Sequence, residues 1–141
     1  MGRICTNPHQ SRQLLKYGFI SQSADLWWSE YALVNNGTPL MMHITEPILY
    51  SYRNNEEDIP AWSLAALLQA LPGSIMYDDV SYYLHITKGQ DVYLIEYTDP
   101  DSGGMLAYRD GTDLIDIAVQ MLIHLVKNKI PLNPAYLYNN I

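Results

Sequence analysis

Three runs of strand-forming residues follow one another in the second half of the chain, at 82–87, 92–98 and 104–109. Short, turn-like connections join them at 88–91 and 99–103, and both connections contain glycine. Parallel strands need long crossovers, whereas short turns join antiparallel neighbours. The spacing therefore predicts a three-stranded antiparallel meander.

Two further runs, at 26–34 and 40–46, predict a first hairpin nearer the N-terminus. They are rich in aromatic and branched residues, and the Asn-Gly pair in 35–38 supplies the positive φ angles of a tight turn. The segment 47–58 is irregular and partly acidic. We expect it to form a surface loop with a short strand at 48–52.

Three segments carry the signals of helices. The clearest is 112–128, because its polar residues recur every three or four positions, with Thr112 as the expected N-cap. Asn7 followed by proline predicts a helix over 8–17. A proline near the start and a Pro-Gly pair beyond the end predict another helix over 58–71.

The resulting order, α-β-β-α-β-β-β-α, predicts an α+β fold in which two or three helices pack on an antiparallel sheet made of a hairpin and a meander. A chain of 141 residues has the size of one domain, so we expect a single domain over 1–141. Prolines in 131–141 prevent this segment from continuing the last helix. We expect it to wrap the surface or to form a partly mobile tail.

Acidic residues outnumber basic ones by 15 to 8, which gives a net charge of −7. Binding to DNA or RNA requires clustered Lys and Arg, so the composition argues against direct nucleic-acid binding. Cys5 is the single cysteine, which leaves no intrachain disulfide. The chain lacks a signal-like apolar start and any run near the roughly 20 apolar residues of a membrane span, so we expect a cytoplasmic protein that does not enter a membrane.

Several short phrases are spread over nearly the whole chain. They are Cys5-Thr6, Gln10-Ser11, Leu14-Leu15 with Gly18, Ala24-Asp25, Pro60-Ala61-Trp62-Ser63-Leu64, Ala66-Leu67-Leu68, Leu71-Pro72 and Asp113-Leu114-Ile115-Asp116. Together they resemble a group of short proteins, without an assigned activity, from anaerobic gut bacteria and from their phages and mobile elements. The resemblance implies a non-enzymatic accessory protein that acts on a host protein in the host cytoplasm, for example in counter-defence.

The chain contains twelve tyrosines and a single phenylalanine, Phe19. Tyrosine suits surfaces that are half in contact with water, although any one ring can also pack at the edge of the core with its hydroxyl in solvent. Our candidate surface residues are Trp27, Trp28, Tyr50, Tyr52, Tyr83, Tyr93, Tyr97 and Arg109. Together they predict an exposed aromatic patch on an acidic protein, suited to binding another protein or a second copy of the chain.

A second hypothesis is a site for a nucleotide-like small molecule, held between aromatic rings, with Arg12, Arg53 or Arg109 meeting its phosphate. The scarcity of basic residues counts against it. A third is an enzyme that uses Asp116 and His124, which share one face of the last expected helix. The same spacing also fits an ordinary solvent-exposed stripe, which we favour.

The segment 99–110 has acidic residues at the first, third and twelfth positions of a calcium-loop pattern, namely Asp99, Asp101 and Asp110. Its flanks are strand-like, and its Asp-Pro and Gly-Gly pairs are typical of a hairpin turn, so we favour the turn. The sequence positions of His9, His43 and His85 are far apart and do not have the spacing typical of metal ligands. We expect neither a metal nor a cofactor.

Overall fold

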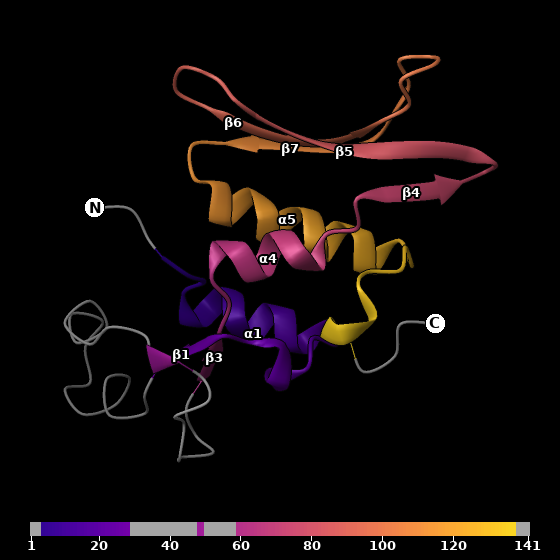
Figure 1. The fold of residues 1–141 in the computed structure, drawn as a ribbon. Coiled ribbons are helices and arrows are strands. Elements are labelled where there is room, and N and C mark those ends of the chain that lie inside the picture. The colour runs from indigo at the N-terminus through magenta and orange to yellow at the C-terminus, as the bar shows by residue number, and fades with distance from the viewer. Residues whose placement is uncertain (1–3, 29–47, 50–58, 138–141) are drawn as a thin grey trace.

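The computed structural model describes residues 4–28, 48–49 and 59–137, and within them it shows one α+β domain with antiparallel sheets, as predicted. A four-stranded sheet forms one side of the molecule, helices α4 and α5 lie beneath it, and α1 separates them from a small sheet at the opposite side (Figure 1). The helices therefore form the middle layer between the two sheets.

The larger sheet has the order β4-β5-β6-β7, and every neighbouring pair is antiparallel. Its strands are β4 (Ser74–Tyr77), β5 (Val80–Lys88), β6 (Tyr93–Thr98) and β7 (Met105–Gly111). The predicted meander is confirmed in β5, β6 and β7, while β4 was not predicted. A bulge between β6 and β7 shifts their register at Tyr97 and Thr98.

Strand β4 escaped prediction because its turn lacks the usual glycine. Tyr77 pairs with Val80, so only Asp78 and Asp79 connect the two strands. Both have positive φ angles, 50° and 65°, as a type I′ turn requires. Aspartate tolerates this region better than most residues, so an Asp-Asp pair can replace Asn-Gly here.

Helix α5 (Leu114–Lys127) lies across the inner face of the larger sheet. Its N-cap is Asp113, whose carboxylate accepts hydrogen bonds from the backbone N–H groups of Ile115 and Asp116. The prediction of Thr112 as N-cap was therefore wrong by one residue. From position 113 the carboxylate can accept hydrogen bonds from two of the N–H groups that the start of a helix leaves without a backbone partner.

Helix α1 (Pro8–Lys16) confirms the prediction for 8–17. Asn7 and Gln10 form a reciprocal capping box at its start. At its end, Gly18 adopts a φ of 101°, and the N–H of Phe19 donates to the carbonyl of Leu14. This is a Schellman motif, in which glycine adopts the left-handed backbone conformation without strain.

The predicted helix over 58–71 was wrong at its N-terminal end. Helix α4 spans Leu64–Ala70, and the residues before it form strand β3 (Ile59–Ala61). Ser63 caps the helix, and the carboxylate of Asp25 accepts hydrogen bonds from both the N–H and the hydroxyl of Ser63. Pro60 is tolerated in β3 because this is an edge strand, where a missing N–H breaks no second ladder.

The smaller sheet has the order β2-β1-β3, with β1 (Leu26–Trp28) in the centre and β2 (Ile48–Leu49) at the other edge. It confirms a strand at the start of 26–34 and a short strand within 48–52. The rest of the expected hairpin, including its turn at 35–38 and its second strand at 40–46, lies outside the described residues.

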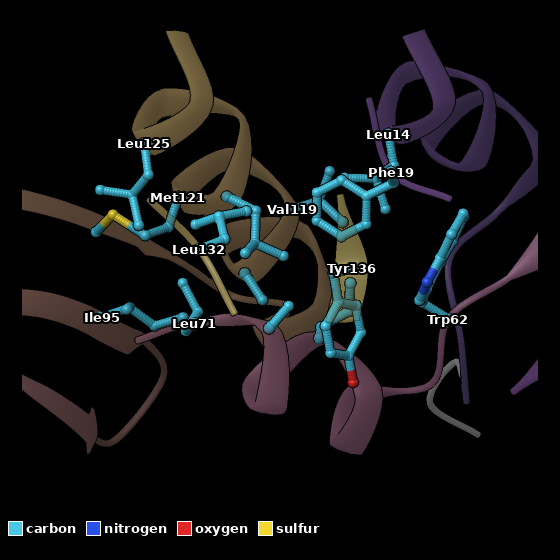
Figure 2. Close-up of a cluster of buried hydrophobic side chains, with 14 of the residues drawn as sticks. Leu14, Phe19, Trp62, Leu71, Ile95, Val119, Met121, Leu125, Leu132 and Tyr136 are labelled. Atoms are coloured by element: carbon cyan, nitrogen blue, oxygen red, sulfur yellow. The ribbon is translucent and has the colours of Figure 1, made fainter. Parts of the chain in front are cut away.

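Three aromatic rings of the core lie close together, namely those of Phe19, Trp62 and Tyr136 (Figure 2). Phe19 meets Trp62 edge to face, with ring centroids 5.7 Å apart, and Tyr136 at 6.1 Å. Leu132 and Tyr136 are buried, so the part of the expected tail that the structure describes packs into the core. Phe19, near the start of the chain, and the segment that follows α5 therefore meet in the core.

Candidate functional site

The larger sheet has one covered face and one open face. The strand pairing places the side chains of Tyr83, Thr98 and Met105 next to one another on one face of the sheet. Glu96 and Tyr108 form a neighbouring pair on the same face. Ile95 and Tyr97 point to the opposite side, against the helices, where both are fully buried. No described element lies over the first side, which we call the outer face (Figure 1).

The outer face carries large apolar side chains in contact with solvent. The exposed fractions are 46% for Tyr83, 52% for Met105 and 47% for Tyr108. Among the described residues, the large hydrophobic side chains with high exposure are Ile4, Met76, Tyr77, Tyr83, Ile86, Val92, Met105 and Tyr108. All of them except Ile4 belong to the larger sheet or its turns. By strand alternation the outer face carries Met76, Tyr83, Met105 and Tyr108, whereas Tyr77 and Ile86 fall on the inner side.

Negative charge surrounds this apolar surface. Glu96 and Asp110 lie on the outer face itself, by the alternation of β6 and β7. The turns between the strands add Asp78, Asp79, Asp91, Asp99 and Asp101. These four strands contain one lysine, Lys88 at the end of β5, and one arginine, Arg109, which lies on the inner side of the sheet. The outer face therefore mixes exposed apolar side chains with acidic ones, and further acidic residues lie in its turns.

The sequence-predicted surface residues divide sharply in the structure. Tyr83 is exposed on the outer face, as predicted. Trp27 is buried, and Trp28 is half-buried, with its indole N–H donating to the backbone carbonyl of Thr6 at 3.0 Å. Tyr50 and Tyr52 lie outside the described residues. The two tryptophans therefore do not extend the outer face.

Tyr93 and Tyr97 lie on the inner side of the sheet, so the ring-bearing face of β6 is its core face. Tyr97 is fully buried, and its hydroxyl donates to the carbonyl oxygen of Pro72 at 2.7 Å. Burial raises the pKa of Tyr97 far above its usual range. The expectation that Tyr97 is a surface residue was therefore wrong. The residues that sequence reasoning missed are Met76, Met105 and Tyr108, which strand alternation within β4 and β7 places outward.

A concave feature lies on the other side of the sheet. It is a cleft of about 480 Å³ between α1, α5 and the inner side of β7. His9 and Gln10 line it from α1, Arg109 from β7, and Asp116, His124 and Lys127 from α5. Val119 and Ile123 supply part of its apolar wall. The polar stripe expected to face solvent on the last helix thus forms one wall of a cleft.

Arg109 and His124 are in direct contact in this cleft. One guanidinium nitrogen of Arg109, Nη2, lies 3.1 Å from Nδ1 of His124, and the other, Nη1, donates to the carbonyl oxygen of Tyr108 at 2.6 Å. Partial burial lowers the pKa of His124, and the positive charges of Arg109 and Lys127 lower it further. His124 is therefore neutral at pH 7.

Asp116 and His124 are both in the cleft, but their contacts do not form a catalytic relay. The Asp116 carboxylate accepts a hydrogen bond from the side-chain amide of Gln10 at 2.7 Å, and Nδ1 of His124 faces Arg109. Among the described lining residues there is no serine, threonine or cysteine to act as a nucleophile. The cleft thus brings Asp116 and His124 to one surface, each with a hydrogen-bond partner of its own.

The segment 99–104 is a hairpin loop held by its own first residue. The Asp99 carboxylate accepts hydrogen bonds from the N–H of Asp101 at 3.0 Å and from the hydroxyl of Ser102 at 2.6 Å, and these lower its pKa. Gly103 has a φ of 76°, which the turn requires. Asp110 lies in β7, opposite Leu94 of β6. These contacts support the turn interpretation of the calcium-like pattern.

Comparison of the chain with protein-family models, curated proteins and solved structures finds no match. Within the described ranges, no helix is both long and apolar enough to span a membrane. Nor do three His, Cys, Asp or Glu side chains of the described residues gather in a group able to hold a metal.

Proposed function

We propose that this is a non-enzymatic binding protein that docks on a partner protein through the outer face of the larger sheet. The observation that supports this most is the concentration of exposed apolar side chains, with Tyr83, Met105 and Tyr108 about half exposed on a face that no described element covers. Large exposed apolar side chains gathered on one open face are typical of protein interaction sites.

The charge of the outer face indicates the chemistry of the partner. A face that combines exposed apolar side chains with Glu96, Asp110 and acidic turns is complementary to a surface that combines apolar side chains with Lys and Arg. Repulsion between like charges disfavours a second copy of this chain, which carries a net charge of −7. The resemblance to proteins of gut bacteria and their phages makes a protein of the bacterial host the partner to test first.

The test is affinity capture from a lysate of the host bacterium, with quantitative mass spectrometry of three baits. The first is the wild-type chain. The second carries Tyr83→Thr and Tyr108→Thr, which remove two rings from the outer face and replace them with β-branched threonine, a residue that suits strands. The third, Ile4→Thr, removes an exposed apolar side chain that lies away from the larger sheet. Circular dichroism checks that all three are folded.

We expect a protein that is captured by the wild type and by Ile4→Thr but is reduced about tenfold or more with the double variant, since aromatic anchors dominate interface energies. Capture should weaken as salt is raised, because the acidic side chains of the outer face and its turns steer the encounter. Equal capture by all three baits would overturn the proposal. Self-association through the outer face, seen by light scattering in the wild type and lost in the double variant, would replace it with a homo-oligomer.

A further inference from the structure

We infer that the cleft between α1, α5 and β7 binds a small oxyanion, such as the phosphate or carboxylate group of a metabolite, with Arg109 as its main anchor. This site is separate from the outer face, because Arg109 pairs with Ile95 and so lies on the inner side of the sheet. The inference stands or falls independently of the proposed partner.

The cleft has the size and lining of a small-molecule site. Its volume of about 480 Å³ lies within the range of such sites, roughly 300–1,000 Å³. Val119 and Ile123 form an apolar part, while Gln13 and Gln120 add amide groups that can donate to an oxyanion. Neither tyrosine nor tryptophan is among its described lining residues, so it does not match the ring sandwich expected for a nucleotide base.

Positive charge gathers in the cleft although the chain as a whole is strongly acidic. Arg109 and Lys127 both line it, and His9 and His124 can add charge on protonation. The one carboxylate in the described lining, Asp116, is already bonded to the amide of Gln10. The partners of Arg109 are a carbonyl oxygen and an imidazole nitrogen, and neither neutralises its charge.

The contact between Arg109 and His124 also prepares donors for an anion. A guanidinium can only donate, so Nδ1 of His124 accepts from Arg109 and the ring proton of the neutral imidazole lies on Nε2. Arg109 has five N–H groups, and its two contacts use only part of this fork. A planar guanidinium beside an imidazole N–H is a suitable pair for an oxyanion.

Anion binding should therefore be coupled to pH. A bound anion favours the protonated form of His124, whereas Arg109 and Lys127 oppose its protonation when the cleft is empty. Asp116 is the negative group that faces the same cleft, and its carboxylate accepts a hydrogen bond from the side chain of Gln10. Affinity for an anion of constant charge should rise as the pH falls.

The experiment uses sulfate, whose charge does not change near neutrality, and measures the melting temperature of the full chain over a low millimolar titration at constant ionic strength. Ligands that bind the native state raise the melting temperature in a saturable way. Sulfate also stabilises proteins without binding a site, so each titration is repeated with two variants. Arg109→Gln removes the anchor, and Arg12→Gln removes the same charge from the exposed side of α1, outside the cleft lining.

We expect saturable stabilisation in the wild type and in Arg12→Gln, and an affinity at least about tenfold lower in Arg109→Gln, because hydrogen bonds to a charged partner are lost. The wild-type affinity should increase about threefold from about pH 7.5 to about pH 5.5. A stabilisation that does not saturate, or that is equal in all three proteins, would overturn the inference.

Histidine NMR on the wild-type chain provides a second readout, which remains decisive if Arg109→Gln does not fold. Sulfate should shift the imidazole signals of His9 and His124 and raise the pKa of His124. His85, on the outer face of β5, is the internal control and should not respond. Equal responses from His85 and His124 would identify a non-specific salt effect and reject the site. A phosphate monoester and a simple carboxylate, titrated in the same way, then distinguish the two classes of ligand.

Discussion

The two faces of the larger sheet are built from alternate residues of the same strands, yet they differ in almost every physical property. The inner face contributes Ile95 and Tyr97 to the core, with no exposed surface on either. The outer face presents Tyr83, Met105 and Tyr108 about half exposed to solvent. Since burial of apolar area is the main source of stability, the inner face stabilises the fold and the outer face is available for binding.

The largest effect should come from truncating the inner face. We expect Ile95→Ala to lower the free energy of unfolding by about 3 kcal/mol, because it leaves a cavity among fully buried side chains. Its neighbour Leu94, on the outer side of the same strand, is only half-buried, and Leu94→Ala should cost about 1 kcal/mol. Urea denaturation of both variants measures the contrast. Equal losses would mean that the outer face is as structural as the inner one.

A smaller effect should follow from removing one hydroxyl. Tyr97→Phe deletes the donor to the carbonyl of Pro72 and should cost about 1 kcal/mol, whereas Tyr83→Phe on the outer face should stay within about 0.5 kcal/mol of the wild type. The pKa of Tyr97 is raised in the folded state. An acid with a raised pKa loses its proton first in the unfolded chain, so its contribution is complete below pH 10 and declines as the pH rises above that value.

Denaturation curves below and above about pH 10 test both parts of this prediction. The wild type should lose stability more steeply than Tyr97→Phe as the pH rises, while Tyr83→Phe should follow the wild type. Parallel curves for the wild type and Tyr97→Phe would contradict the assigned role of the buried hydroxyl.

The contrast between the faces also shows what a sequence can and cannot predict. Helix α1 and strands β5 to β7 were predicted because their signals are local: the cap at Asn7, the stop at Gly18 and short turns between strands. The start of α4 was not, because Pro60 and the residues beside it pair with β1, far earlier in the chain. Tertiary pairing here overrides a pattern that locally favours a helix.

The candidate sites were predicted less well than the fold, for the same reason. Alternation separates Tyr83 from its neighbours, but only the packing of α5 decides which face of β6 is buried, and Tyr97 was assigned to the wrong one. The cleft is even less local. Gln10 and Asp116 are 106 residues apart in sequence and meet only because α1 and α5 pack together.

The variant with the largest expected effect on binding should have only a small effect on folding. Tyr83→Thr combined with Tyr108→Thr should change the free energy of unfolding by no more than about 1 kcal/mol, since both rings are half exposed and threonine suits strands. The same urea denaturation that measures Ile95→Ala measures this variant. A loss of about 3 kcal/mol would show that these rings support the sheet, whereas near-native stability with lost partner capture can only come from a surface whose role is recognition.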